Sequence, residues 1–193
     1  QEYSPGNHPL SLEKAMELRI RLARKEDIPA LEALIAASVR ELSVGYYTSE
    51  QMEKALVEIF GVDTQLIEDE TYFVVEADGI LAGCGGWSKR KTLCGGDQTK
   101  EESDPLIDPA TDRARIRAFF IHPSFARKGI GSRLLKACED AAMAAGFTQA
   151  EMVATLPGVP LYSVYGYEVF EEYELPMSGG EVLPVKGMAK SLK

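Results

Sequence analysis

The sequence predicts an α+β fold in which helices cover one mixed, mostly antiparallel sheet of about seven strands. Several short segments alternate apolar and polar residues as half-buried strands do, and others carry apolar residues at helical spacing. Asp78-Gly79 separates two apolar runs, which indicates a hairpin and therefore antiparallel pairing. A basic, glycine-containing loop at residues 127–132 joins a predicted strand to a predicted helix.

Residues 17–23 alternate and predict the first strand. A helix is expected over residues 28–39, with Asp27 as its N-cap and Pro29 in its first turn. A second helix, capped by Thr48 or the following serine, is expected to end at Gly61.

The predicted hairpin strands are residues 71–77 and 80–87. Glycines inside the second strand predict a bulge or a close backbone approach; they are Gly83, Gly85 and Gly86. Residues 89–111 form a polar connection that is long for an unstructured loop, which predicts either a functional or a mobile segment.

Residues 113–121 predict the central strand, and residues 134–145 a helix with an apolar stripe that Gly146 ends. Uniform alternation would place Ala114, Ile116, Ala118 and Phe120 on one face of this strand and Arg115, Arg117, Phe119 and Ile121 on the other.

The C-terminal part predicts a strand at 149–155, a short helix at 157–165 and a strand at 166–173. Residues 182–190 predict a final strand, although Pro184 and Gly187 interrupt its pattern.

Length and composition predict one domain over residues 17–193, preceded by a disordered or non-native tail at residues 1–16. No apolar run approaches the ~20 residues of a membrane span. The net charge of −9 argues against nucleic-acid binding and suits a cationic amine substrate, although solubility explains it more simply. The three cysteines show no metal-ligand or disulfide spacing, so we expect a reducing, cytoplasmic location and no metal.

The loop at residues 127–132, before the helix predicted at 134–145, has the composition of a phosphate-binding site. A helix start offers backbone N–H groups without intrahelical partners and a partial positive charge. Glycines let that backbone approach a diphosphate, and side chains at those glycines would block the approach. The predicted phosphate ligands are Arg127, Lys128, Gly129, Ile130, Gly131 and Ser132. A wider basic patch would favour an anionic ligand; it comprises Arg113, Arg115, Arg117, Arg127, Lys128 and Arg133.

Residues 126–131 read Ala-Arg-Lys-Gly-Ile-Gly and follow a strand and His122-Pro123. This combination resembles the acetyl-CoA-binding motif Gln/Arg-x-x-Gly-x-Gly/Ala of the GNAT superfamily of N-acetyltransferases. Ala126 departs from the motif at its first position. A dinucleotide-binding Rossmann protein is the weaker alternative, because Leu134 stands where that fingerprint requires a third glycine.

The resemblance covers nearly the whole chain from Leu18 onward and implies the GNAT fold, in which two central parallel strands splay apart at the cofactor site. It also implies that acetyl-CoA is the cosubstrate. Main-chain groups at the end of the first splayed strand would hydrogen-bond the pantetheine arm, and by position these belong to Phe119, Phe120 and Ile121.

The segment from Tyr162 to Tyr167 reads Tyr-x-x-x-Gly-aromatic and resembles a second motif of the same family. The resemblance places Tyr162 beside the thioester sulfur, where its phenol would act as the general acid for the departing thiolate. Simple packing of tyrosines in a short helix is the alternative.

The resemblance implies direct acetyl transfer to a primary amine without a covalent enzyme intermediate, with a backbone N–H near Ile121 stabilising the oxyanion. A non-catalytic acyl-CoA-binding or sensor domain on the same fold is the alternative. The general base is left open between Glu151, Glu76 and a water chain, and His122 is a weaker candidate. A nucleophilic cysteine, either Cys84 or Cys94, is also disfavoured.

The expected acceptor is a small-molecule or peptide amine, bound between residues 39–51, the loop after Trp87 and the C-terminal strands. Tyr46, Tyr47 and Trp87 could line this pocket. Homodimers are common in the family, but no interface can be located from the sequence.

Overall fold

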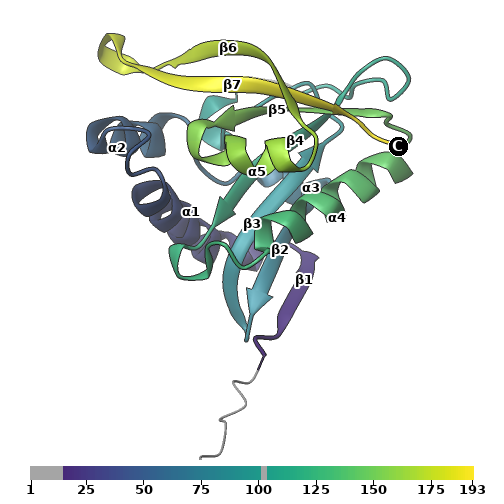
Figure 1. The fold of residues 1–193 in the computed structure, drawn as a ribbon, viewed down its shortest axis with the longest axis horizontal. Helices are drawn as coiled ribbons and strands as arrows, with labels where there is room; N and C mark the ends of the chain where they lie inside the picture. The colour runs from purple at the N-terminus through teal and green to yellow at the C-terminus, as the bar shows by residue number, and fades with distance from the viewer. Residues whose placement is uncertain (1–14, 101–103) are drawn as a thin grey trace, which may run out of the picture.

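The computed structural model describes residues 15–100 and 104–193, so the predicted tail at residues 1–16 lies almost wholly outside the described residues. Its centre is a seven-stranded sheet with the strand order β1-β2-β3-β4-β5-β7-β6 (Figure 1). The strands are β1 (Leu18–Leu22), β2 (Tyr72–Ala77), β3 (Ile80–Ser88), β4 (Ala114–Ile121), β5 (Gln149–Thr155), β6 (Glu168–Pro176) and β7 (Val182–Ser191).

Helices cover both faces of the sheet. On one face, α1 (Ile28–Leu42), α2 (Ser49–Glu58) and α3 (Thr64–Glu68) share an apolar core with β2, β3 and β7. On the other face, α4 (Ile130–Ala144) packs against β2, β3 and β4, and α5 (Val159–Val164) lies near the start of α4. The predicted α+β layers are therefore confirmed.

Every neighbouring strand pair is antiparallel except β4 and β5. These two run parallel and pair at only two positions, Ala114 with Ala150 and Arg115 with Glu151. Beyond Arg115 the strands diverge, so the rest of β4 has no strand partner on this edge. This divergence is the splay that the resemblance implied, and it rules out the all-parallel sheet of a Rossmann protein.

The β2–β3 hairpin turns at Asp78-Gly79, as predicted. Both residues have positive φ angles, 49° and 82°, as a two-residue turn that follows the right-handed strand twist requires. The predicted strand and helix at residues 149–155 and 157–165 are also confirmed, by β5 and α5.

A β-bulge interrupts β4 next to the splay. Arg117 lies opposite Gly86 on β3, whereas Phe120 lies opposite Cys84, so β4 contains one residue more than its partner strand here. Ala118 has a φ of 55°, which is uncommon for a residue with a side chain.

The bulge changes which face the later side chains reach. Ala114 and Ile116 pack on the α4 face, as does Phe119, whereas Ala118 and Phe120 pack on the face that α1 and α2 cover. The uniform alternation predicted from the sequence was therefore wrong, because the extra residue reverses the strand's parity halfway along.

Other differences are local. The short α3 was not predicted, and β6 extends three residues further than expected, to Pro176. Asp27 occupies the N-cap position of α1 without a capping hydrogen bond, because its carboxylate pairs with Arg21 at 2.8 Å instead. Strand β7 continues through Pro184, which lies beyond the last β5 pair and needs no N–H donor on that edge.

Within residues 15–100 and 104–193, no helix has the length and apolarity needed to cross a bilayer.

Candidate active site

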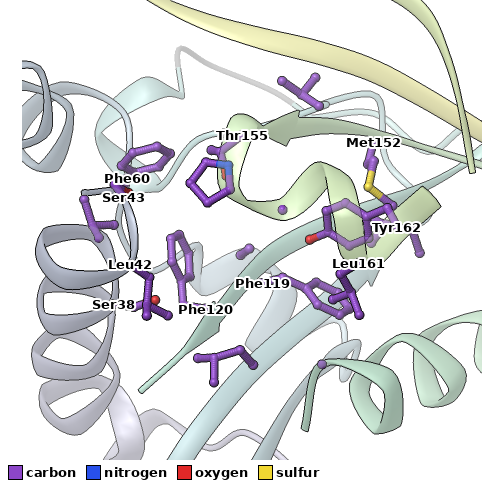
Figure 2. Close-up of a pocket in the computed structure, with 18 of the residues that line it drawn as sticks. Ser38, Leu42, Ser43, Phe60, Phe119, Phe120, Met152, Thr155, Leu161 and Tyr162 are labelled. Carbon is purple, nitrogen blue, oxygen red and sulfur yellow. The ribbon is translucent and has the colours of Figure 1, made fainter. Parts of the chain in front are cut away.

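The divergence of β4 from β5 opens a cavity of about 750 Å³. Its wall is formed by the end of β4, the loop before α4 and the start of α4, then by β5, α5, α1 and the loop that follows β3. Figure 2 shows two ends of this cavity, with Phe119, Leu161 and Tyr162 at one and Ser38, Leu42 and Phe60 at the other.

The loop before α4 exposes a run of backbone donors at the first end. Gly129 is the N-cap with a φ of 79°, and Arg127 has a φ of 59°. Arg133 donates the first helical hydrogen bond, to the carbonyl of Gly129. From Arg127 to Ser132, no backbone N–H bonds to another residue of the described chain. These donors and the left-handed turns form the kind of concavity that binds anions.

The two glycines of this loop differ in what they permit. A Cβ atom on Gly129 would meet nothing within 4 Å, so this position requires glycine for its backbone angle rather than for protein packing. A Cβ on Gly131 would lie 2.8 Å from Cδ2 of Leu161 on α5. Gly131 therefore lets α4 pack closely against α5, the helix that carries Tyr162. This packing role was not predicted from the sequence.

The predicted basic patch is smaller than expected. Arg113 and Arg115 both pair with Glu151, at 3.2 and 2.5 Å, so their charge is largely neutralised. Arg117 is buried and pairs with Asp63 at 2.9 Å. Arg127, Lys128 and Arg133 remain exposed and form no ion pair with another described residue, but among them only Arg127 lines the cavity.

Tyr162 projects from α5 into the cavity (Figure 2). Its side chain is 8% exposed, and its hydroxyl has no hydrogen-bond partner in the described chain. Burial, and secondarily the nearby Cys138 thiol, raise the pKa of the Tyr162 phenol above its ordinary value. The phenol therefore stays protonated at neutral pH and can donate its proton.

The unpaired edge of β4 also faces this space. His122 donates its backbone N–H to the carbonyl of Ala82, which lies at the start of β3's pairing with β4. Because successive peptide groups of a strand point to opposite edges, the N–H of Ile121 points away from β3 and toward the splay. Phe119, Phe120 and Ile121 all line the cavity.

The predicted cofactor residues thus gather in one place, although their binding role stays a prediction. Nine of the ten predicted site residues line the cavity, and Lys128 does not. The nine are Phe119, Phe120, Ile121, Arg127, Gly129, Ile130, Gly131, Ser132 and Tyr162.

None of the side chains considered as a general base lines the cavity. Glu151 is held between Arg113 and Arg115, and Glu76 pairs with Arg21 at 2.9 Å. His122 lies outside the cavity wall, and its Nδ1 accepts a hydrogen bond from the Ser124 N–H at 3.1 Å.

The cysteines differ in their placement. Burial raises the pKa of the Cys84 thiol to about 12, despite the hydrogen bond that it accepts from Tyr72. Cys94 lines the cavity, and burial raises its pKa too. Cys138 is wholly buried in the α4 core. These pKa shifts leave the thiols protonated, which does not favour a nucleophilic role.

Of the aromatic residues predicted to line an acceptor pocket, only Tyr46 does so. Tyr47 is buried, donates its hydroxyl proton to the Pro184 carbonyl and accepts the N–H of Leu156. Trp87 packs edge-to-face on Phe147 in the α4 core. Both are structural residues, so their predicted pocket role was wrong.

The loop after β3 contributes residues that sequence reasoning did not single out. Leu93, Cys94 and Gly95 line the cavity, as does Phe60, two residues after the end of α2. The unusual length of the loop indicated a possible functional role. The sequence could not show which of its residues line the cavity, because their positions depend on contacts with distant residues.

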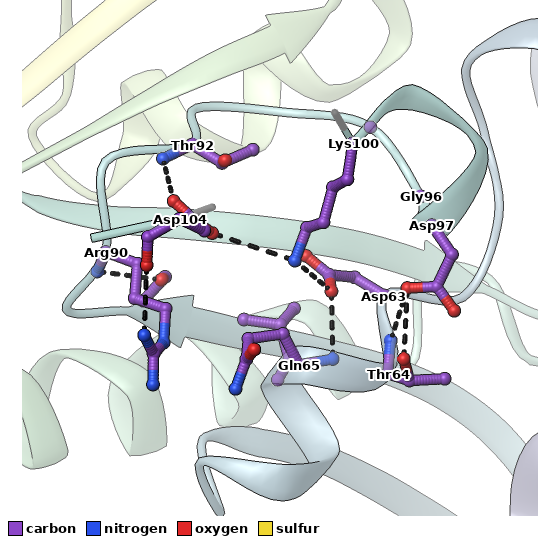
Figure 3. Close-up of polar contacts among 12 residues, drawn as sticks. Asp63, Thr64, Gln65, Arg90, Thr92, Gly96, Asp97, Lys100 and Asp104 are labelled. Carbon is purple, nitrogen blue, oxygen red and sulfur yellow. Dashed lines mark hydrogen bonds and ion pairs between the residues drawn. The ribbon is translucent and has the colours of Figure 1, made fainter. Parts of the chain in front are cut away.

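A network of polar contacts holds this loop against the segment before α3 (Figure 3). The buried Asp63 carboxylate pairs with Lys100 at 2.6 Å and with Arg117 at 2.9 Å. Arg117 also donates to the Gly95 carbonyl at 2.7 Å, and Asp104 accepts the N–H of Thr92 at 2.8 Å. In its described part the loop is therefore fixed by charge pairs, which favours the functional alternative over the mobile one.

A family model provides the decisive comparison. The Acetyltransferase (GNAT) family model matches residues 19–167. The chain belongs to this family. No match was found among curated protein sequences.

GNAT proteins of known structure share the fold along almost their whole length. A GCN5-related N-acetyltransferase from Rhodopseudomonas palustris superimposes with a TM-score of 0.68 at 20% identity, over 93% of this chain and 99% of that chain. PaiA N-acetyltransferase from Thermoplasma acidophilum, solved in complex with coenzyme A, gives 0.63 at 18% identity over 91% and 99%. The protein yncA from Salmonella typhimurium, solved with its cofactor acetyl-CoA, gives 0.61 at 16% over 92% and 95%.

Proposed function

We propose that this GNAT acetyltransferase moves the acetyl group of acetyl-CoA to a primary amine by direct attack, with Tyr162 as the general acid. The observation that carries the proposal is convergence on one cavity. The free N–H groups at the start of α4, the unpaired edge of β4 and the hydroxyl of Tyr162 all border it.

The residues present fit coenzyme A. The donors at residues 127–132 and the charge of Arg127 suit its pyrophosphate, and the edge of β4 suits the amide groups of its pantetheine arm. A cavity of about 750 Å³ lies within the usual range for small-molecule sites, roughly 300–1,000 Å³. Related GNAT structures that contain coenzyme A or acetyl-CoA support the same assignment.

Acetyl-CoA would supply an acetyl thioester, whose C–S bond breaks after the amine nitrogen has formed its new bond to the carbonyl carbon. The N–H of Ile121 would donate to the carbonyl oxygen as negative charge develops on it. Tyr162 would give its proton to the departing sulfur, and the proton that the amine loses restores the phenol through solvent. Holding both reactants in one cavity would supply much of the rate enhancement.

The cofactor assignment is tested with a matched pair of glycine variants. Gly129 and Gly180 have nearly equal φ angles, 79° and 78°, and a Cβ atom on either would meet nothing within 4 Å. Gly129→Val and Gly180→Val should therefore suffer similar backbone strain. Only Gly129→Val should lose the rise in melting temperature that acetyl-CoA gives the unmodified chain.

Thermal-shift titrations of both variants with acetyl-CoA measure this rise, and titrations with NAD test the dinucleotide-binding alternative. Equal acetyl-CoA responses in the two variants would argue against the phosphate site at the start of α4. Acetyl-CoA binding without thiol release in the presence of any amine would favour the alternative, a non-catalytic acyl-CoA-binding or sensor domain.

A further inference from the structure

The end of the cavity away from α4 is apolar, and we call it the acceptor wall. It is built by segments that lie far apart in the sequence and meet only in the fold. The acceptor wall consists of Val39, Leu42, Phe60, Leu93, Leu175 and Val185.

Charged side chains are scarce around the whole cavity. Among the described residues that line it, Arg117 and Arg127 are the charged ones, and none is Asp, Glu, His or Lys. Arg127 belongs to the loop before α4, at the opposite end from the acceptor wall. An ammonium group that entered the acceptor wall would therefore lose its water without gaining a carboxylate, which is unfavourable.

The buried carboxylate of Asp63, which pairs with the cavity-lining Arg117, is already occupied. Asp63 accepts from Arg117 through Oδ2, and from Lys100 and the N–H of Gln65 through Oδ1, at 2.9, 2.6 and 3.0 Å. Lys100 also pairs with Asp104 at 3.6 Å, so both carboxylates of this cluster are already paired with cations and neither is free for a cationic substrate.

Aromatic and hydroxyl groups define what the acceptor wall can bind. Phe60 and Phe120 form an edge-to-face pair with ring centroids 5.9 Å apart, which suits a flat or aliphatic body. Ser38 and Ser43 line the cavity and are nearly buried, and their hydroxyls have no hydrogen-bond partner in the described chain. They can bind a neutral polar group.

We infer that the acceptor of the proposed acetyl transfer is a monoamine with an apolar aryl or alkyl body, bound in its neutral form, rather than a polyamine or aminoglycoside. This inference rests on the proposed function. It departs from the cationic substrate that the net charge of −9 would suit, because the negative charge of the chain does not extend to the described cavity wall.

Binding in the neutral form follows from the titratable groups that face the substrate. Among the described residues they are Tyr46 from the segment after α1, Cys94 from the loop after β3, Arg117 from β4, Arg127 from the loop before α4 and Tyr162 from α5. Neither a carboxylate nor an imidazole is among these described groups, so they offer the amine no base, and it loses its proton in solution before it binds.

An amine panel with acetyl-CoA tests the inference, with release of free coenzyme A thiol as the measurement. We expect kcat/KM for 2-phenylethylamine and hexylamine to exceed that for spermidine and kanamycin by about 100-fold or more, since an unpaired buried charge is strongly rejected. Preferential acetylation of spermidine or kanamycin would overturn the inference and leave the acetyltransferase proposal intact. Failure of acetyl-CoA to raise the melting temperature would instead overturn the proposed function itself.

A charge variant makes the test independent of the native substrate. Leu42→Asp places a carboxylate on the acceptor wall, whereas Val57→Asp places one on α2, where the native side chain is 74% exposed and does not line the cavity. We expect Leu42→Asp alone to shift the ratio of kcat/KM values toward spermidine by about tenfold or more. Equal ratios in both variants would overturn the assignment of this wall to the acceptor.

The pH profile tests the neutral form. For 2-phenylethylamine, kcat/KM should rise about tenfold per pH unit up to the amine's own pKa, and the break should move down with the less basic 2,2-difluoro-2-phenylethylamine. A break near about pH 7 for both amines would reveal an enzyme base in the histidine range and overturn this part of the inference.

Discussion

The ring of Tyr162 is held on several sides. Phe119 and Tyr167 contact it edge-to-face, with centroid distances of 6.1 and 6.2 Å. Gly158 leaves room for it, because a Cβ atom there would lie 2.8 Å from Cε2 of the ring. The position of the hydroxyl is therefore fixed by packing alone, so that little conformational entropy would be lost in the proposed proton transfer.

Removing this hydroxyl should separate catalysis from binding. Tyr162→Phe is expected to lower kcat by about 10²-fold or more, the usual contribution of a general acid, and to leave acetyl-CoA affinity nearly unchanged. Tyr167→Phe is the matched control, because the Tyr167 hydroxyl bonds to Glu139 outside the cavity. Steady-state thiol release and calorimetric titration measure the two effects, and an unaltered kcat in Tyr162→Phe would remove the assigned role.

The pH dependence of kcat provides a second readout at this residue. A general acid must be protonated, so turnover falls as pH rises through its pKa. Burial raises the pKa of Tyr162, which moves this fall above the ordinary phenol value of about 10. In Tyr162→Phe the alkaline fall should disappear, within the pH range where the fold is intact by circular dichroism.

At the scale of elements, α4 and α5 are coupled through one contact. Gly131 at the start of α4 faces Leu161 on α5, the residue next to Tyr162. The element that offers backbone donors and the element that carries the phenol therefore cannot shift independently. A displacement of α5 by a few tenths of an ångström would change the distance between the two.

Gly131→Ala should show this coupling. The added methyl group overpacks the contact with Leu161, and we expect a loss of about 1–3 kcal/mol in the free energy of unfolding together with a lower kcat. Leu161→Ala opens space, so the double variant should recover part of both losses. A denaturant-based double-mutant cycle measures the coupling energy between the two residues. Strict additivity of the two losses would show that Gly131 and Leu161 do not couple α4 to α5.

Local signals in the sequence were sufficient for most elements. Asp78-Gly79 specifies its turn through backbone preference alone, and the glycines after the central strand mark the start of α4 without help from the rest of the chain. The parity change at Ala118 could not be read from the strand itself, because a bulge depends on pairing with β3. For the same reason Tyr47 and Trp87 were misplaced, since their roles are decided by distant partners at Pro184 and Phe147.

At the scale of the whole molecule, buried charges join segments that the sequence separates widely. Asp63 precedes α3, Arg117 lies in β4 and Lys100 lies in the loop after β3, yet they form one cluster. Figure 3 shows the pair between Asp63 and Lys100. The side chains of Asp63 and Arg117 are each 1% exposed, so both charges depend on each other for compensation. The cluster holds Leu93 and Gly95 in the cavity wall.

Asp63→Asn should be among the most damaging substitutions that keep the side-chain shape. It leaves Arg117 buried without its counter-charge, which typically costs about 3–5 kcal/mol in the free energy of unfolding. Glu53→Gln, which breaks the exposed pair with Arg40, is the control and should cost about 0–1 kcal/mol. Urea denaturation compares the two, and a similar small loss in both would show that the buried cluster contributes little.

The short seam between β4 and β5 has a consequence for how copies of this protein behave beside one another. A strand with unmatched peptide groups is normally a template on which a neighbouring chain can add a strand and begin aggregation. Here the unmatched length of β4 borders a cavity whose walls include α1, α5 and the loop after β3, and these elements flank the edge where a strand from a neighbour would have to add. The walls of the cavity would therefore hinder edge-to-edge association of two copies while leaving the peptide groups of β4 accessible to a small ligand.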